Sequence, residues 1–312
     1  MQFEPEIQSS TQKTVGEELI KLAGKYKNFS VFNANTATEF SLANFGKEFN
    51  ERYFDFGNAI SAMIGSAAGF AVRGKIPFLF GSANDLIGKN WLAIRNSLCV
   101  SQTNVKLIGA YGGMLSGQDG PFNHALEDLS LMRVVPNMKV VCPADSIEAK
   151  KALEVMMLDF GPTYLRLFSL PLPNLYSPDH KFVFGKGHIY KSGNDICIFA
   201  IGTGVHTALD AAEHLEREGR SVMVVNISSL QPIDDDLIVE CAKAVNHVFT
   251  VEDHQIIGGL GSAVCEILSA EYPMKVHRIG MDGFSESARV DDLYKKFQLD
   301  GVGIAEQVMK QI

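Results

Sequence analysis

The chain contains 312 residues, which predicts two domains because a single domain usually holds about 100–200 residues. Apolar residues make up 46% of the sequence and charged residues 21%, a balance that excludes a disordered chain. The formal net charge of −8 argues against a protein that binds nucleic acid or an anionic membrane, because both of those partners are themselves negatively charged.

Short apolar runs alternate with longer amphipathic runs, which predicts an α/β fold with a mostly parallel sheet between helices. In the first half, the expected strands are Phe29–Phe32, Pro77–Phe80, Val105–Ala110, Met138–Cys142 and Thr163–Leu167. The expected helices are Thr14–Tyr26, Ala59–Arg73, Ile87–Ser97, Ala125–Met132 and Ser146–Leu158. Most of these strands are apolar at consecutive positions, as expected when helices cover both faces of a sheet.

Three prolines interrupt Ser169–His180 and predict a linker rather than a regular element. A second α/β unit follows it. Its expected strands are Asp195–Ile201, Val222–Asn226, Val248–Val251 and Val276–Ile279, and its expected helices are Thr207–Glu218, Asp234–Val245 and Gly261–Glu271. We therefore expect two α/β domains, comprising residues 1–182 and 183–312, each a mostly parallel sheet flanked by helices.

The chain carries five cysteines without the spacing of a metal site, namely Cys99, Cys142, Cys197, Cys241 and Cys265. Scattered cysteines in apolar surroundings are typical of reduced thiols in the core of a cytosolic protein. No apolar run reaches the roughly 18 residues of a membrane-spanning helix. The first residues also lack the basic and apolar regions of a signal peptide. We therefore expect a cytoplasmic protein with no membrane partner.

Ser116–His124 is the most polar segment, and it follows an expected strand. Ligands gather at the carboxyl ends of the strands in an open parallel sheet, so Asp119, Asn123 and His124 are candidates to bind a substrate or to transfer a proton. The alternative is a turn that Asp119 caps, with His124 exposed. The residue types alone leave both interpretations open.

Two glycine-rich segments, Gly202–Gly204 and Gly258–Gly261, precede expected helices, and the backbone amides of such segments can hold an anion. The first segment lacks the third glycine and the acidic residue of a dinucleotide-binding fingerprint. The second segment, taken alone, is an equally weak indication of nucleotide binding. A dehydrogenase-like protein that binds a nicotinamide cofactor is therefore disfavoured.

Several segments, taken in order, resemble the transketolase family, specifically its pyrimidine-binding domain followed by its C-terminal domain. In the first half these segments are Arg52–Gly57, Gly65–Ala71, Gly117–Pro121, Glu127–Asp128, Cys142–Asp145 and Gly161–Arg166. In the second half they are Leu230–Asp234 and Glu252–Val264. The resemblance covers nearly the whole chain, and it implies a transferase of carbohydrate metabolism that depends on thiamine diphosphate.

The diphosphate-binding domain of that family has no counterpart in this sequence. In the family, this domain binds the diphosphate and Mg²⁺ through a Gly-Asp-Gly motif, which does not occur here. The resemblance therefore implies the smaller subunit of a split transketolase, with a separate partner subunit that binds the diphosphate and the magnesium ion. Because the cofactor of such enzymes lies between chains, the resemblance also implies an α2β2 heterotetramer and no metal site in this chain.

The positions that the resemblance assigns to the cofactor carry unusual residues. Family members have a glutamate that bonds the pyrimidine ring, in a run resembling Gly-Ile-Ala-Glu-Gln, and the matching residue here is Ile60. Loss of a general acid–base group costs a factor of about 10²–10⁴ in rate. The simpler interpretation of Ile60 is packing against Ile64, one helical turn later. The aromatic residues that stack on the pyrimidine fall near Ser82 and Asp85, which cannot stack, so Phe80 is the remaining aromatic candidate.

The positions that bind the substrate differ as well. Asn123 matches the substrate-binding histidine of the family, and His124 compensates only if the loop shifts. An aspartate of the family's first loop corresponds to Asn35. The arginine that holds the sugar phosphate lies just after the position of Arg166, but the residue that matches it is Ser169. The predicted site therefore consists of Asp119, Asn123 and His124 for catalysis, Ile60, Phe80, Ser82 and Asp85 for the cofactor, and Asn35 and Arg166 for the substrate.

Two functions follow from these differences. The first is a transketolase-like subunit that moves a two-carbon ketol or acyl unit within a complex. Its acceptor would not be an ordinary sugar phosphate, and a nucleotide-linked sugar or a keto acid is compatible. The second is a structural or regulatory subunit that keeps the fold and the interface but has lost the chemistry.

Overall fold

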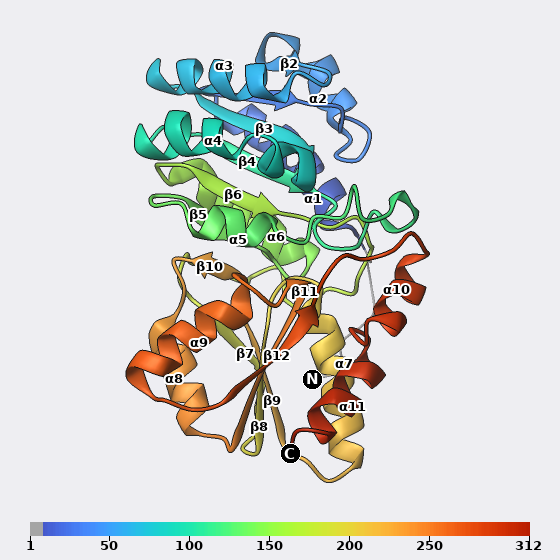
Figure 1. Ribbon diagram of the computed structural model, residues 1–312. Coiled ribbons are helices and arrows are strands. Elements are labelled where there is room, and N and C mark those ends of the chain that lie inside the picture. Colours follow the sequence, from blue (N-terminus) through green and yellow to red (C-terminus); the bar gives the residue numbers. More distant parts are fainter. Residues whose placement is uncertain (1–8) are drawn as a thin grey trace.

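Seven strands form the first sheet, which lies in the upper half of Figure 1. In spatial order they are β10 (Ser229–Gln231), β5 (Lys139–Val141), β6 (Thr163–Arg166), β4 (Lys106–Ala110), β3 (Ile76–Ser82), β1 (Phe29–Asn33) and β2 (Tyr53–Asp55). All neighbouring strands are parallel except β10 and β5. The structure is a computed structural model that describes residues 9–312.

Helices cover both faces of this sheet. One face shares a core with α1 (Thr11–Lys25), α2 (Leu42–Glu48) and α6 (Ser146–Leu158). The other face packs against α3 (Ile60–Val72), α4 (Trp91–Ala93), α5 (Asp128–Arg133) and two wide-turn π-helical segments, η2 (Asn84–Gly88) and η3 (Ile94–Val100). Two short 3₁₀ turns, η1 (Asn50–Arg52) and η4 (Gly117–Asp119), lie in the connections. Since both faces are buried, the inner strands are apolar at consecutive positions, as predicted.

Five strands form the second sheet, in the lower half of Figure 1. In spatial order they are β12 (Val276–Met281), β11 (His247–Gln255), β8 (Ile196–Ala200), β9 (Val222–Asn226) and β7 (His188–Lys191), and only β7 is antiparallel to its neighbour. One face packs against α8 (Asp235–Lys243) and α9 (Leu260–Glu271). The other face packs against α7 (Gly204–Arg217), α10 (Val290–Lys296) and α11 (Gly301–Met309).

The two halves share both a sheet and a core. β10 belongs to the second half by sequence, yet it pairs with β5 at the edge of the first sheet. The core beneath α3 and α5 also continues without a break to α8 and α9. The second half is therefore held firmly against the first.

The predicted fold class is confirmed: both sheets are mostly parallel and flanked by helices. Helix α6 and strand β9 have the predicted bounds. The expected helix Ile87–Ser97 is divided between η2, α4 and η3, and the strands β2, β7 and β10 and the helices α2, α10 and α11 were not predicted. Four cysteines are buried, Cys265 is partly exposed, and all five thiols are free. Within residues 9–312, no helix has the length and apolar character to cross a bilayer.

Candidate functional site

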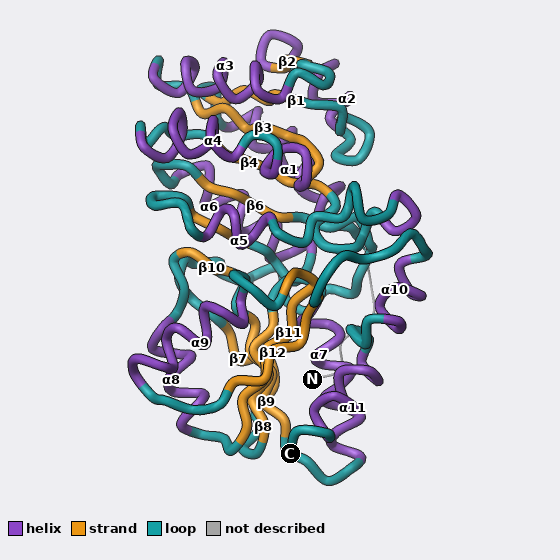
Figure 2. Tube along the Cα trace, in the orientation of Figure 1, coloured by secondary structure: helices purple, strands orange, loops and turns teal. Residues whose placement is uncertain are grey.

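A cavity of about 140 Å³ opens where β1, β3 and β4 end. Figure 2 shows the loops at this edge of the first sheet gathered beside α10. The carboxyl edge of a parallel sheet is where ligands collect in open α/β folds. Six of the residues predicted from the sequence line this cavity, namely Asn35, Ile60, Ser82, Asp85, Asp119 and Asn123.

Local backbone geometry brings these residues together. Asn35, just after β1, has a φ of 59°, and Tyr111, just after β4, has a φ of 56°. The left-handed region is uncommon for residues other than glycine, and for an aromatic residue it is a clear outlier. Such strained residues concentrate at ligand sites. On the opposite wall, the Ser82 hydroxyl accepts a hydrogen bond from the Asp85 amide at 3.3 Å, which fixes the start of η2.

Ile60 is the first residue of α3 and is half-buried. Its side chain packs against the core that contains Ile64, and it also lines the cavity. The turn before it is held by Asp55, whose carboxylate accepts a hydrogen bond from the Gly57 amide at 2.9 Å. Position 60 therefore faces the cavity with an aliphatic side chain that cannot transfer a proton.

Glu39 and Tyr111 are among the cavity residues that sequence reasoning missed. Burial raises the pKa of Tyr111 to about 12, and the charge of Glu39, a hydrogen bond with Glu39 and the charge of Asp119 act in the same direction. Both residues belong to loops that follow strands, which is the signal that would have identified them. No lysine, arginine or histidine lines the cavity within residues 9–312.

His124 lies outside the cavity. Its side chain is buried, its Nε2 atom lies 3.0 Å from the Gly117 carbonyl oxygen, and its Nδ1 atom is hydrogen-bonded to Ser285. Burial lowers the pKa of His124, although the Gly117 carbonyl partly opposes that shift. Both ring nitrogens are engaged, so the imidazole joins the loop Ser116–His124 to the second half of the chain.

Phe80 also lies outside the cavity, because its side chain points to the other face of the sheet. It is fully buried and packs edge-on against Phe40, with ring centroids 4.8 Å apart. The aromatic ring that lines the cavity belongs to Tyr111 instead.

Arg166 is buried between the two halves. Its Nε atom lies 3.0 Å from Oδ2 of Asp128, and its Nη2 atom donates to the carbonyl oxygens of Ala125 and Asp253, each at 2.8 Å. Burial alone would lower the pKa of Arg166, but the neighbouring negative charges, above all that of Asp128, outweigh it and raise the pKa. Arg166 therefore joins two parts of the fold and does not reach the cavity.

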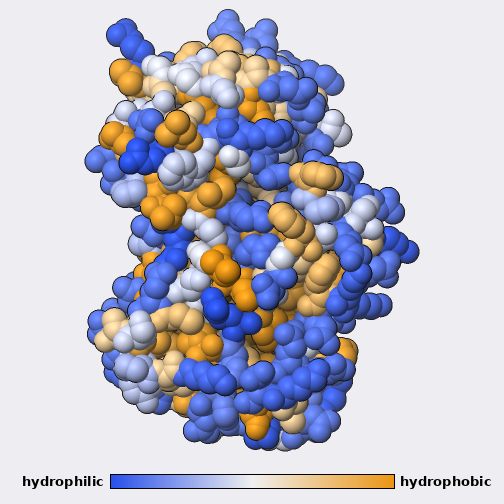
Figure 3. Space-filling model, viewed as in Figure 1, coloured by the Kyte–Doolittle hydropathy of each residue, from blue (hydrophilic) through white to orange (hydrophobic). Residues whose placement is uncertain are grey.

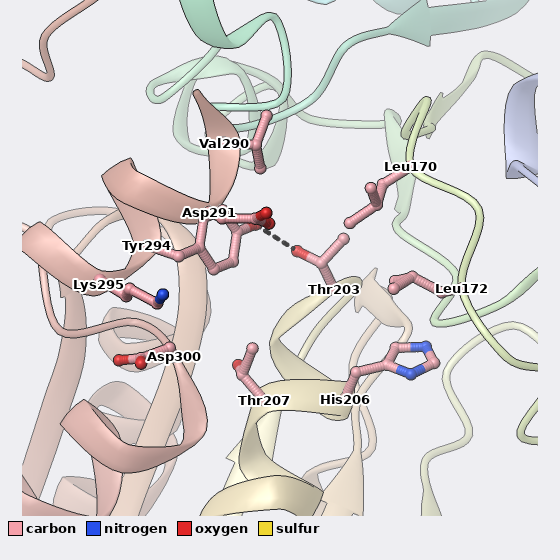
Figure 4. Close-up of a pocket in the computed structure, with 10 residues that line it drawn as sticks. All are labelled: Leu170, Leu172, Thr203, His206, Thr207, Val290, Asp291, Tyr294, Lys295 and Asp300. Carbon is pink, nitrogen blue, oxygen red and sulfur yellow. Dashed lines mark hydrogen bonds between the residues drawn. The ribbon is translucent and has the colours of Figure 1, made fainter. Parts of the chain in front are cut away.

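A second cavity, of about 270 Å³, is lined mainly by the second half, together with Leu170 and Leu172, and contains none of the predicted site residues (Figure 4). Thr203, the residue that precedes α7, faces Tyr294 of α10 across it, and His206 of α7 also lines it. The Tyr294 hydroxyl donates to Asp253 at 2.7 Å and lies 3.1 Å from the Thr203 hydroxyl, and His206 bonds the Ala144 carbonyl. These hydrogen bonds join neighbouring elements of the fold. Among residues 9–312, no three His, Cys, Asp or Glu side chains are placed to hold a metal ion.

The fold is that of a protein built like the C-terminal half of a transketolase. Residues 8–171 match the transketolase pyrimidine-binding domain, and residues 185–304 match the transketolase C-terminal domain. The chain belongs to the transketolase family.

Relatives of similar length include subunits and sections of transketolases. A protein of Methanocaldococcus jannaschii is 37% identical over 310 residues, covering 98% of this chain and 97% of its own, and its name refers to a transketolase C-terminal section. The 6-deoxy-6-sulfo-D-fructose transketolase subunit of a Clostridium species is 33% identical over 282 residues, covering 90% of this chain and 88% of its own. A solved structure, described as a split-gene transketolase in an inactive β4 tetramer, has a TM-score of 0.89 and 36% identity, covering 97% of this chain and 98% of its own.

Proposed function

We propose that this chain is the smaller subunit of a split transketolase, which uses thiamine diphosphate to transfer a two-carbon ketol or acyl unit. The observation that carries the proposal is the cavity in which Asn35, Ile60, Ser82, Asp85 and Asp119 meet. Relatives of the same length that are named as sections or subunits of transketolases support it. The proposal includes domains of residues 1–182 and 183–312, and a cytoplasmic location that suits the free cysteines.

The cavity fits the pyrimidine ring of the cofactor in size and polarity. Its volume is about 140 Å³, and a protein cavity of about 150 Å³ can hold one benzene ring. Asn58, Ser82 and Asp85 would contact the ring, and Ile60 would lie against it. Thiamine diphosphate, when bound, supplies the nucleophilic carbon that breaks a bond next to a carbonyl group. The diphosphate and Mg²⁺ would be held by the partner subunit.

The residues of this chain would orient the substrate rather than exchange its protons. The Asn123 side chain donates to the Asp119 carbonyl oxygen at 3.2 Å and so fixes the loop that presents the Asp119 carboxylate. That carboxylate is exposed in the cavity and is free to accept a hydrogen bond from a substrate hydroxyl. His124 and Arg166 would act only by positioning, because both are buried outside the cavity.

The exposed side of α3 is suited to the partner subunit. It presents Ala62, Gly65, Ser66 and Gly69 to solvent, and Figure 3 shows hydrophobic residues gathered on the side of the upper half where α3 and α4 lie. Phe122, in the loop whose Asn123 lines the cavity, is 90% exposed. Exposed apolar side chains that gather on one face are typical of a protein–protein contact. A partner on α3 would close the cavity beside Ile60, and two such pairs would form the α2β2 heterotetramer.

A catalytically inactive subunit is the second candidate, and Ile60 favours it. An aliphatic residue at the usual glutamate position removes the side chain that promotes proton transfer, while the fold and the exposed face of α3 remain. A chain of this kind would still assemble with a diphosphate-binding subunit.

Calorimetric titration of thiamine diphosphate and Mg²⁺ distinguishes the two candidates. The titration is made on the chain alone and on its mixture with the diphosphate-binding partner, after complex formation has been established by size-exclusion chromatography. We expect binding only in the mixture. Absence of binding in an established complex would contradict the enzyme proposal and favour the inactive subunit.

Gly65→Leu tests the interface, with Gly24→Leu in α1 as its control. Both glycines are helical and exposed, and an added Cβ atom would meet no neighbour within 4 Å at either position. Helix propensity favours leucine over glycine, so both variants should fold. We expect Gly65→Leu to prevent complex formation and Gly24→Leu to leave it unchanged. Normal assembly of Gly65→Leu would rule out the α3 face.

A further inference from the structure

The cavity is negatively charged at the end formed by the loops that follow β1 and β4. Glu39 lies in the first of these loops, and Tyr111 and Asp119 lie in the second. Asp85 lines the opposite wall, where Lys89 neutralises it with Nζ at 2.5 Å from Oδ1. Within residues 9–312, neither Glu39 nor Asp119 forms an ion pair, so the cavity offers two uncompensated carboxylates.

The arrangement of this end is held in place by the backbone. Tyr111 is kept in the left-handed region, and its hydroxyl stays protonated near neutral pH, because burial and the Glu39 charge raise its pKa to about 12. Its proton is therefore available to Glu39 as a hydrogen bond. The second loop bends through three further residues with positive φ, Gly113, Gly117 and Gly120, and it presents Asp119 to the same space.

One polar atom at this end has no hydrogen-bond partner among residues 9–312. The hydroxyl oxygen of Ser116, a residue that lines the cavity, is buried and forms no hydrogen bond within the described part of the chain. Buried polar atoms are almost always hydrogen-bonded, so an unpaired one beside a cavity indicates a group that a ligand completes.

We propose that this end of the cavity binds the protonated amino group of the substrate, with Glu39 and Asp119 as counter-ions and Ser116 as a hydrogen-bond acceptor. The substrate class is therefore an amino-substituted aldose or ketose. A phosphate or carboxylate in the same place would meet two like charges and no cation from this chain, which disfavours sugar phosphates and keto acids. The assignment of this ligand as the substrate of two-carbon transfer rests on the proposed function.

The test compares three sugars of similar size: D-glucosamine, D-glucose and D-glucose 6-phosphate. Each is titrated into the full-length chain, alone and in complex with the partner, at low ionic strength and about pH 6.5, where exposed carboxylates are ionised. Binding is followed by NMR chemical shifts. The variant is Glu39→Gln, and Glu51→Gln, an exposed carboxylate in η1 that does not line the cavity, is its control.

We expect glucosamine to bind at least about tenfold more tightly than glucose, since it pairs with two carboxylates, and glucose 6-phosphate to bind most weakly. Glu39→Gln should reduce the preference for glucosamine over glucose about tenfold, whereas Glu51→Gln should leave it unchanged. Equal binding of glucosamine and glucose, tighter binding of the phosphate, or an unchanged preference in Glu39→Gln would each overturn the proposal.

Failure of all three sugars to bind, both to the chain and to the complex, would overturn it as well. The proposed function is tested separately by titrating thiamine diphosphate into the same complex. A preference for glucosamine without binding of thiamine diphosphate would refute the proposed enzyme function but support the amine-binding site. Binding of thiamine diphosphate without a preference for glucosamine would refute the amine-binding site alone.

Discussion

Replacing Arg166 by methionine should destabilise the fold by about 3–5 kcal/mol, because removal of one partner from a buried ion pair leaves the other charge uncompensated. The side chains of Arg166 and Asp128 are 5% and 2% exposed, and Nε lies 3.0 Å from Oδ2. Methionine replaces the aliphatic stem but none of the donors. The carbonyl oxygens of Ala125 and Asp253 would also lose their donor, so the loss should lie in the upper part of that range.

Urea denaturation followed by circular dichroism measures this loss. With a slope of about 3 kcal/mol per M, suited to a larger chain, the midpoint should fall by about 1–2 M. Arg166→Lys keeps the positive charge but lacks the planar guanidinium group with its several donors, so a smaller loss of stability is expected. As a control, Glu286→Ala removes an exposed pair with Lys296, in which the side chains are 59% and 54% exposed, and it should cost less than about 1 kcal/mol. A stable Arg166→Met protein that binds substrate poorly would refute this reasoning and support a substrate-binding role for Arg166.

Three further predictions concern single positions. Ile60→Glu in the assembled complex should raise the rate of ketol transfer by about 10²–10⁴, and an unchanged rate would show that the cofactor geometry has moved as well. Burial lowers the pKa of His124, so the unfolded chain binds a proton more readily and stability should fall as the pH drops through about 6.5. Urea titrations at about pH 7.5 and 5.5 should show a smaller decline for His124→Gln than for the wild type, and an equal decline would contradict this. Burial raises the pKa of Glu148 from 4.5 to about 7, so the folded chain holds this proton more tightly and stability should decrease as the pH rises from about 4.5 to about 7. Urea titrations across this range should show that Glu148→Gln removes at most about 3 kcal/mol of the decrease. An unaltered pH dependence would argue against this.

The inner strands could be predicted because burial on both faces leaves a continuous apolar run, as in β3 and β4. β10 gives no such signal, since its three residues form a strand only because β5 of the other half pairs with them. β2 is a short, half-exposed edge strand. The expected helix Ile87–Ser97 has the right apolar period, but wide turns in η2 and η3 divide it.

The site was predictable where family motifs mark it and unpredictable where tertiary contacts create it. Asn35 and Asp119 lie in recognisable segments, and both line the cavity. Glu39 and Tyr111 belong to no motif, and they meet only because β1 and β4 flank β3 and their loops turn to the same side. The position of His124 depends on Ser285, a residue 161 positions later that no local pattern connects to it.

The second half of the chain determines the shape of a cavity that it does not line. The Met114 amide donates to both carboxylate oxygens of Asp253 at 3.2 Å, and a Cβ atom on Gly113 would come within 1.8 Å of that carboxylate. Ser285 and Ser287 hold the same loop through His124 and the Gln118 carbonyl. Every described residue that lines the cavity nevertheless belongs to the first half. The loop that carries Asp119 is held by its own half through Asn84, whose side chain donates to the Phe122 carbonyl oxygen at 2.6 Å, and by the C-terminal half through Asp253, Ser285 and Ser287. Substitutions in the C-terminal half should therefore alter ligand binding without touching the ligand.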